Sequence, residues 1–441
     1  MEIPEHLLAG SLPCACGQTH TVPIEKIVVG HEAQQELVAY LQQRNLHNVL
    51  LVADANTYAA CGESLAAKLV GAQWHVQTRL FSGEEELLPD EAAVLHVRQA
   101  LQQHTYDIVL AVGSGVINDI VRYATHAEGL GYISVPTAAS VDGYASSIAA
   151  MQFDGLKITT PAQAPQAIFA DLAVLRETPF HLIQSGFGDL AGKAISLLDW
   201  QLARTLYGEY FCPTSYEIVF QPLAYVVEHA EQIKARDEEA VKNLCIGLMN
   251  SGIAMAMMGN SRPCSGSEHH CSHFWDLSAY HHERHHHAHG LQVGYATHWM
   301  IRFYQFVWQL EHIAPPLVPE VTDAFVEEAR KRYGAGADEI ISVQQAKHDA
   351  QQTQQSAIAA VSMQAVRAAL QPGFALLDDV KQALFKMDIP DTAGFIEIDK
   401  ELLGKTFLHA KALRSRYTVF DFLAGQDLLN KAADEILSGD M

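Results

Sequence analysis

The sequence predicts an α/β domain with a parallel sheet, followed by an all-α domain. In the first third of the chain, short apolar runs alternate with stretches of helical composition, a pattern typical of parallel strands joined by crossover helices. After about Asp171, long stretches rich in Ala, Leu, Glu and Gln replace the apolar runs. The 441 residues also exceed what one hydrophobic core usually contains, so two domains are expected.

The first domain contains three runs that predict buried strands, at 48–54, 106–112 and 131–135. Helix-forming residues with apolar side chains at helical spacing lie between them, at 59–70 and 89–104.

The second domain is predicted to be built from helices at 187–208, 225–258, 321–333, 344–370 and 425–437. Segment 157–176 contains two prolines and is the expected joint between the domains. We therefore expect a nucleotide-binding domain at 1–172 and a helical domain at 173–441.

The composition excludes some functions and favours one compartment. Hydrophobic residues make up 49% of the chain, and 29 Lys and Arg against 51 Asp and Glu give a net charge of −22, which disfavours nucleic acid as a partner. The first residues lack the pattern of a signal peptide, and no uninterrupted apolar run approaches the about 18–20 residues of a membrane span. Seven scattered cysteines do not resemble a disulfide framework. We expect a cytoplasmic protein without a membrane span.

A glycine-containing turn, 113–119, follows the strand predicted at 106–112 and precedes a helix-like stretch that reaches about Ala124. Such a turn lets the backbone approach a diphosphate at a helix N-terminus, as in Rossmann-like domains. Asn118 stands where the dinucleotide fingerprint has its third glycine, so an ordinary βα turn is an equally good interpretation of this segment alone.

Two further features favour a dinucleotide site. Asp54 ends a predicted strand, where a carboxylate can accept a hydrogen bond from a ribose hydroxyl, although a helix N-cap explains it equally well. Loop 136–147 follows the strand at 131–135 and offers small hydroxyl side chains at the edge where α/β proteins bind ligands. An ordinary polar loop is the alternative.

Three predicted helices carry residues that could bind a metal. The pattern Ser-x-x-Glu at 265–268 is typical of a capping box, and His269 and His273 then share one face of the helix that follows. His289 and Asp189 lie near the starts of two other predicted helices. One carboxylate and two imidazoles would leave the open coordination position that a catalytic metal needs.

By spacing alone, packed histidines and a capping role for Asp189 are the more frequent interpretations of these residues. The tract 281–289 holds six histidines in nine residues and could bind metals adventitiously. Within it, His285, His286 and His287 are possible substitutes for the third ligand.

Several of these blocks together resemble the sn-glycerol-1-phosphate dehydrogenases, above all their bacterial members. This family is a branch of the iron-containing alcohol dehydrogenase and dehydroquinate synthase-like superfamily. The resemblance runs in order from about Asn48 to Tyr417, and it rests on five blocks, which read GSGVIND (113–119), SVPTAASVDGYASS (134–147), GFGD (186–189), SGSEH (265–269) and HGLQVG (289–294).

The resemblance implies a dehydroquinate synthase-like fold and the reduction of dihydroxyacetone phosphate to sn-glycerol 1-phosphate for glycerophospholipid synthesis. It implies NAD(H) or NADP(H), one divalent metal (zinc, nickel or iron) and a homodimer. Matching positions would give metal ligands at Asp189, His269 and His289, and substrate contacts at Asp142, Asp189 and His273, with Asp189 and His273 catalytic. The dinucleotide would contact Asp54, Gly115, Val116, Ile117, Asn118, Asp119, Thr137, Ala138, Ala139, Ser140 and Ser146.

Other functions remain open at this point. A glycerol or polyol dehydrogenase would use an unphosphorylated substrate, and a sugar-phosphate cyclase of the same fold would use NAD only transiently. A metal-storage protein would explain the histidine tract but neither 113–119 nor 134–147. The sequence does not identify the metal, the physiological direction or the choice between NADH and NADPH, although Asp54 would disfavour a 2′-phosphate.

Two departures and one gap accompany the resemblance. Ala139 stands where the family usually has proline, and the histidine-rich segment makes the third metal ligand less secure. The residues Cys14, Cys16 and His20 also recur in the family, and we expect them to form a structural turn, because they fall short of a zinc ribbon; metal binding is the less favoured alternative. Basic residues that could pair with a phosphate, each more simply interpreted as a surface charge, are Lys193, Arg262, Arg414 and Arg416.

Overall fold

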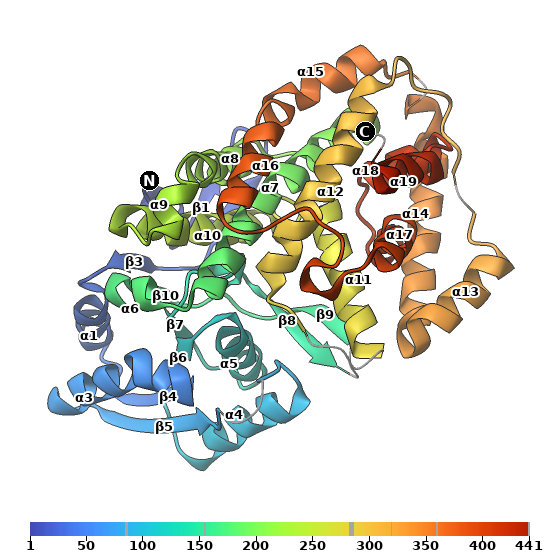
Figure 1. Cartoon of the computed structure of the whole chain (residues 1–441). Helices are drawn as coiled ribbons and strands as arrows, with labels where there is room; N and C mark the ends of the chain where they lie inside the picture. Colours follow the sequence, from blue (N-terminus) through green and yellow to red (C-terminus); the bar gives the residue numbers. More distant parts are fainter. Residues whose placement is uncertain (84–86, 154–155, 282–285, 319, 359, 440–441) are drawn as a thin grey trace.

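The computed structural model describes residues 1–439 apart from 84–86, 154–155, 282–285, 319 and 359. Figure 1 shows the two regions that the sequence predicts: a sheet with flanking helices in the first part of the chain, drawn in blue to teal, and helices in the rest, drawn in green to red. The last strand ends at Asp171, so the change in residue composition along the sequence coincides with the end of the sheet. The boundary between domains 1–172 and 173–441 stays a prediction.

The central sheet has six parallel strands in the order β3-β10-β7-β6-β4-β5. Alternate residues of each inner strand point to opposite faces, so Val49 and Leu51 of β4 belong to one hydrophobic core and Leu50 and Val52 to another. The strands are β3 (Lys26–Gly30), β4 (Asn48–Asp54), β5 (His75–Phe81), β6 (Ile108–Gly113), β7 (Tyr132–Pro136) and β10 (Ala167–Asp171).

Helices cover both faces of the sheet. One face carries α1 (Ala33–Gln43) and the continuous run of α2 (Ala55–Thr57), the π-helix η2 (Tyr58–Gly62) and α3 (Glu63–Gly71); the other face carries α4 (Glu91–Gln103) and α5 (Gly115–Ala127).

The three predicted strands correspond to β4, β6 and β7, and the two predicted helices to the run η2–α3 and to α4. The strands β3, β5 and β10 were not predicted from the sequence. β3 and β5 are edge strands with mixed exposure, and β10 lies within segment 157–176, which we expected to be the joint between the domains.

Two antiparallel hairpins complete the strands: β1 (Gly10–Pro13) with β2 (Thr19–Val22), and β8 (Ile148–Phe153) with β9 (Leu156–Pro161). The first hairpin contacts α10, and its Val22 belongs to the core of the helical region. The second follows the loop after β7 and reaches α11, as Figure 1 also shows.

The helical region spans the remainder of the chain. The expected helix at 225–258 is interrupted at residues 229 and 235–237, where Arg236 has a φ of +58° and Asp237 caps the next helix. The helices are α6 (Leu172–Glu177), α7 (Phe180–Tyr207), α8 (Pro213–Glu228), α9 (Ala230–Lys234), α10 (Glu238–Met258), α11 (Ser267–His281), α12 (His289–Gln309), α13 (Asp323–Tyr333), α14 (Ala337–Ile358), α15 (Met363–Phe374), α16 (Leu377–Lys386), α17 (Lys400–His409), α18 (Val419–Gly425) and α19 (Leu429–Ser438).

Within the described ranges, one helix, α10, is long and apolar enough to cross a membrane by length and composition. Its apolar window is 83% buried inside the structure, where α10 packs against α7, α8 and β2. This burial is typical of a core helix and explains why the helix is so apolar.

Candidate active site

A cavity of about 520 Å³ opens between the carboxyl edge of the sheet and the helical region. Its walls come from the turn before α5, from the loop after β7, and from α7, α11 and α12. In doubly wound sheets, ligands bind at this edge, where neighbouring strands are continued in opposite directions. Here the chain runs from β4 outward to β5 and then crosses back to β6, on the other side of β4.

Three side chains converge at the helical end of this cavity. Asp189 of α7, His269 of α11 and His289 of α12 place their ligand atoms within 4.8 Å of one another. Nε2 of His269 lies 3.5 Å from Oδ1 of Asp189. The three residues expected as metal ligands are therefore neighbours, although they are far apart in the sequence. One carboxylate and two imidazoles suit zinc, nickel or iron and leave coordination positions for a substrate.

Glycines bring two of these helices unusually close. A Cβ on Gly290 of α12 would lie 1.9 Å from the carbonyl oxygen of Ser185, and a Cβ on Gly188 of α7 would lie 2.2 Å from the carbonyl oxygen of Gly290. Any side chain would push the helices apart at this point. Because Asp189 and His289 adjoin these glycines, the close approach sets the distance between the two ligands.

A second layer of polar groups orients the imidazoles. Oε1 of Glu268 lies 2.6 Å from Nδ1 of His269 and also accepts the N–H of Gly266. Ser272 Oγ lies 3.2 Å from Nδ1 of His289. With Nδ1 so engaged, Nε2 of His269 remains available as a ligand, an arrangement common around metal-binding histidines.

The sequence pattern predicts only a capping role for Glu268, in a capping box that begins at Ser265. The helix instead begins at Ser267, and the glutamate bonds to the N–H of Gly266, the residue before the helix. The position of Glu268 directly before His269 was the sequence signal for its second role.

Lys193 corrects another expectation, because it is fully buried rather than a surface charge. Its Nζ lies 2.7 Å from Oδ2 of Asp142 and 2.7 Å from Oδ1 of Asp189. Burial alone would lower the pKa of Lys193, but the two carboxylates outweigh this and raise it. Burial and the charge of Asp189 raise the pKa of Asp142. The buried lysine thus compensates the two carboxylates.

The other three basic residues are also covered to some extent. Arg262 is buried, donates through Nε to Glu209 at 2.7 Å and is therefore already paired, contrary to the expectation of a surface charge. Arg416 is half-buried and donates to the carbonyl oxygen of Ser265 at 3.0 Å. Arg414 is half-buried as well.

His273 lines the cavity beside the proposed ligands. Its ring centre lies 6.3 Å from that of His269 and 5.8 Å from that of His289. His286 and His287 also line the cavity, and Nδ1 of His286 lies 3.9 Å from Oδ1 of Asp276. His285, the remaining alternative ligand, lies outside the described residues, as do 282–284.

The opposite end of the cavity contains the turn before α5. Asn118 is buried, and its side-chain oxygen has no hydrogen-bond partner among the described residues, so it offers an acceptor to a bound ligand. Of the residues expected to contact a dinucleotide, the cavity lining includes Gly115, Val116, Asn118, Asp119, Ser140 and Ser146. The others, Asp54, Ile117, Thr137, Ala138 and Ala139, do not line it.

Asp54 has a local role in this structure. It is the N-cap of α2, and its Oδ1 accepts the N–H of Thr57 at 2.9 Å. It nevertheless ends β4, which pairs with β6 in the middle of the sheet. Its position at the carboxyl edge is the one that the sequence predicted.

Hydrogen bonds attach the loop after β7, residues 137–146, to the helical region. The Oγ of Ser185 donates to the carbonyl oxygen of Ser140 at 2.9 Å, and the N–H of Asp142 donates to Oδ2 of Asp189 at 3.0 Å. On the other side, the buried Arg122 donates to the carbonyl oxygens of Gly143 and Tyr144. No motif in the sequence indicates this role for Arg122.

Comparison with known proteins agrees with this geometry. The family described as iron-containing alcohol dehydrogenase matches residues 28–179. Among solved structures, an iron-containing alcohol dehydrogenase from Thermococcus thioreducens superposes with a TM-score of 0.62 and 16% identity, over 94% of this chain and 98% of the other. A sulfoacetaldehyde reductase from Bifidobacterium kashiwanohense, solved with NAD+, superposes with a TM-score of 0.61 and 15% identity, over 95% of this chain and 98% of the other. These likenesses establish the fold.

Curated relatives are more similar in sequence. A glycerol-1-phosphate dehydrogenase [NAD(P)+] from Geobacillus stearothermophilus is 38% identical over 69% of this chain and 76% of its own length. The protein of that name from Bacillus subtilis is 38% identical over 64% of this chain and 71% of its own length. The protein of that name from Methanosarcina acetivorans is 31% identical over 69% of this chain and 85% of its own length. With such identity across most of each relative, the chain belongs to the glycerol-1-phosphate dehydrogenase family, a branch of the iron-containing alcohol dehydrogenases.

Proposed function

We propose that this protein reduces dihydroxyacetone phosphate to sn-glycerol 1-phosphate with NADH or NADPH and one divalent metal. The observation that carries the proposal is one cavity that extends from the turn at Ser114 and Gly115 to His269 and His289, the two histidines that lie next to the buried Asp189. The substrate and the cofactor are inferred from the relatives named glycerol-1-phosphate dehydrogenase [NAD(P)+]. The product would serve glycerophospholipid synthesis.

The donor set fits a metal that acts on a carbonyl group. When bound, the metal polarises the C2 carbonyl of the substrate as a Lewis acid, and the reduced nicotinamide supplies the hydride. Asp189 is held as a ligand by Lys193 and by the N–H of Asp142. His273 lies beside both imidazole ligands, from where we expect it to pass a proton to the C2 oxygen of the product.

The dinucleotide is expected along the carboxyl edge of the sheet, with its diphosphate at the N-terminus of α5. No side chain caps this helix through Ser114, so its first N–H groups are available to phosphate oxygens. The carboxylate of Asp54 would accept a hydrogen bond from the adenosine ribose and disfavour the 2′-phosphate of NADPH.

Replacing Asp54 by Ser tests this placement without removing the helix cap, since serine caps helices as well as aspartate does. The KM for NADH should rise about 10-fold or more, while the unfolding midpoint stays unchanged. An unchanged KM would show that Asp54 only caps α2.

The first experiment is NADH oxidation by metal-reconstituted protein, with dihydroxyacetone phosphate compared with dihydroxyacetone and with identification of the product enantiomer. Preference for the phosphate, with sn-glycerol 1-phosphate as product, supports the proposal. Oxidation only with dihydroxyacetone would overturn it in favour of a polyol dehydrogenase. No oxidation with either would favour a sugar-phosphate cyclase or a binding protein.

Two further parts of the proposal concern the state of the protein in the cell. Resemblance to the family favours a homodimer, which light scattering at several protein concentrations tests directly. None of the seven cysteines, all of which lie within the described residues, forms a disulfide, in keeping with a reducing, cytoplasmic compartment.

A further inference from the structure

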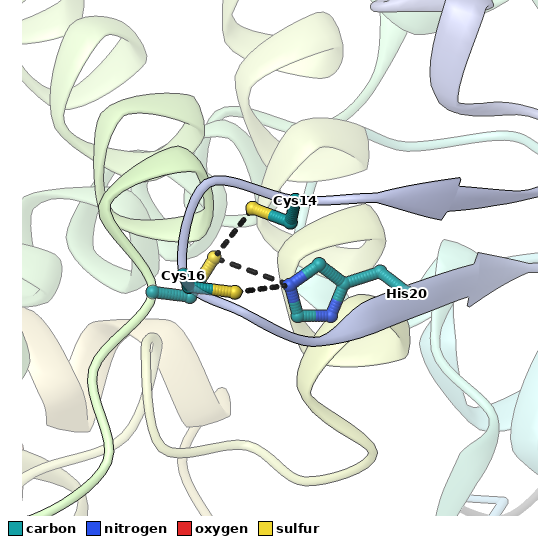
Figure 2. A group of neighbouring side chains, drawn as sticks. Cys14, Cys16 and His20 are labelled. Atoms are coloured by element: carbon teal, nitrogen blue, oxygen red, sulfur yellow. Dashed lines mark hydrogen bonds between the residues drawn. The ribbon is translucent and has the colours of Figure 1, made fainter.

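A second cluster of side chains that could bind a metal contains no residue of the active-site cavity lining. Cys14 and Cys16 belong to the turn between β1 and β2, and His20 lies on β2; Figure 2 shows the three side chains converging. The fourth member, Cys212, is the N-cap of α8 and comes from a distant part of the sequence. The ligand atoms of the four residues lie within 4.8 Å of one another.

The sulfur–sulfur distance in this cluster matches the edge of a metal-centred tetrahedron, and two sulfur–nitrogen distances are about 0.3–0.4 Å shorter than the corresponding edge. With bonds of about 2.3 Å to sulfur and 2.0–2.1 Å to nitrogen, a tetrahedral zinc ion separates two sulfurs by about 3.8 Å and a sulfur from a nitrogen by about 3.6 Å. The two sulfurs of Cys14 and Cys212 are 3.7 Å apart. Nε2 of His20 lies 3.2 Å from Sγ of Cys16 and 3.3 Å from Sγ of Cys212.

A hydrogen bond orients His20 so that its free ring nitrogen can bind a cation. Nδ1 of His20 lies 2.7 Å from the carbonyl oxygen of Met257. Because a carbonyl oxygen only accepts, Nδ1 carries the proton, and the lone pair of Nε2 faces the sulfurs.

Hydrogen-bond donors also surround the sulfurs. The N–H of Ser215 donates to Sγ of Cys212 at 3.4 Å. The hydroxyls of Thr214 and Tyr210 lie 3.2 Å from Sγ of Cys14 and 3.0 Å from Sγ of Cys16, where they can donate to thiolates.

We propose that Cys14, Cys16, His20 and Cys212 bind one structural zinc ion. Four protein ligands close the coordination sphere, so this ion is not a catalytic one. A disulfide between Cys14 and Cys212 is the competing arrangement, but it would leave Cys16 and the oriented His20 without a role. Cys14 and Cys16 are half-buried, which gives an ion a path into the site.

The zinc ion would add a link between three parts of the chain, of which α10 already packs against α8 and β2. It would tie the β1–β2 hairpin to the start of α8 and, through His20 and Met257, to the last turn of α10. The segment after α10 continues to Ser261, Cys264 and Ser265, which line the active-site cavity. The zinc site would therefore restrain the start of the segment that connects α10 to α11.

Cobalt substitution distinguishes this site from the active site by its absorption spectrum. The three proposed active-site ligands contain no sulfur, so only the cysteine cluster should give thiolate-to-cobalt charge-transfer absorption in the near ultraviolet, with intense tetrahedral bands in the visible. The unmodified chain reconstituted with cobalt should show these bands and bind two ions per chain. His269→Ala should keep the bands and bind one ion.

Cys212→Ser should lose the bands and one ion per chain, whereas Cys61→Ser, which alters a buried cysteine of the α/β region, should lose neither. If Cys212→Ser does not fold, the spectra of the unmodified chain and of His269→Ala still decide. Absence of charge-transfer bands in both would overturn the proposal. So would a Cys14–Cys212 disulfide, found by mass spectrometry in protein purified with reductant. None of these readouts depends on enzymatic activity.

Discussion

The two metal-binding clusters of this molecule differ in ligand number, ligand type and surroundings. The active-site cluster has one carboxylate and two imidazoles, opens onto a cavity of about 520 Å³, and is compensated by the buried Lys193. The hairpin cluster has three sulfurs and one imidazole and adjoins no described part of that cavity. An open site with one carboxylate and two imidazoles suits catalysis, whereas a closed site with three soft sulfurs and one imidazole suits a structural metal.

The difference also concerns how each cluster is assembled. The active-site ligands project from long helices whose backbones touch at Gly188 and Gly290, so their spacing depends on helix packing. The hairpin ligands project from a short turn, a strand and a helix cap, and the two strands of this hairpin bury only His20 and Val22. We therefore expect the first site to stay organised without its metal and the second to lose order without it.

His269→Ala should have the largest effect on activity. Loss of a metal ligand should lower kcat/KM by about 10³-fold or more, because the substrate carbonyl loses its electrophilic partner. Steady-state NADH oxidation and metal analysis by mass spectrometry measure this, with the exposed His312→Ala as control. Full activity with metal still bound would remove His269 from the site.

Gly290→Ala should come next, with a loss of about 10²-fold in activity. The new methyl group would collide with the carbonyl oxygen of Ser185 and displace His289 from Asp189. Thermal unfolding should show a destabilisation of about 1–3 kcal/mol. Gly71→Ala is the matched control, since a Cβ there meets no atom within 4 Å. Equal behaviour of the two variants would mean that the helices can separate without harm.

Glu268→Gln should weaken the active-site metal about 10–100-fold, because His269 loses its carboxylate partner. Activity measured against metal concentration should shift by the same factor and recover at saturation. A loss of activity that excess metal does not restore would assign Glu268 a different role. Cobalt bands of the hairpin site should not change, which tests the independence of the two clusters.

Tyr210→Phe should have the smallest effect and should touch only the hairpin cluster. The hydroxyl beside Cys16 belongs to a partly exposed side chain, so its loss should cost about 1 kcal/mol or less. Zinc transfer to a competing chelator should become a few-fold faster, with kcat unchanged. A drop in kcat would indicate that the two clusters are coupled.

The sequence predicted the parts of this molecule that follow from local pattern. Continuous apolar runs identified β4, β6 and β7, and the motifs around Asp189, His269 and His289 indicated one metal site before their proximity was known. The confirmed family and fold rest on several such motifs in order.

What the sequence did not predict depends on contacts between distant residues. Nothing near Cys212 indicates that it meets Cys14, because only the packing of the β1–β2 hairpin against α8 and α10 brings them together. Lys193 was interpreted as a surface charge because burial of a lysine depends on carboxylates from two other segments meeting it. The roles of Glu268 and Arg122 depend in the same way on tertiary structure.

The attachment of loop 137–146 to α7 has a thermodynamic consequence. The same loop that faces the expected dinucleotide donates the N–H of Asp142 to Asp189, an expected metal ligand. If the dinucleotide fixes this loop, the two binding equilibria share one conformational free energy and are linked. Linkage is reciprocal, so the factor by which bound NADH raises the affinity for the metal must equal the factor by which bound metal raises the affinity for NADH. Loss of this hydrogen bond should therefore weaken both effects by the same factor.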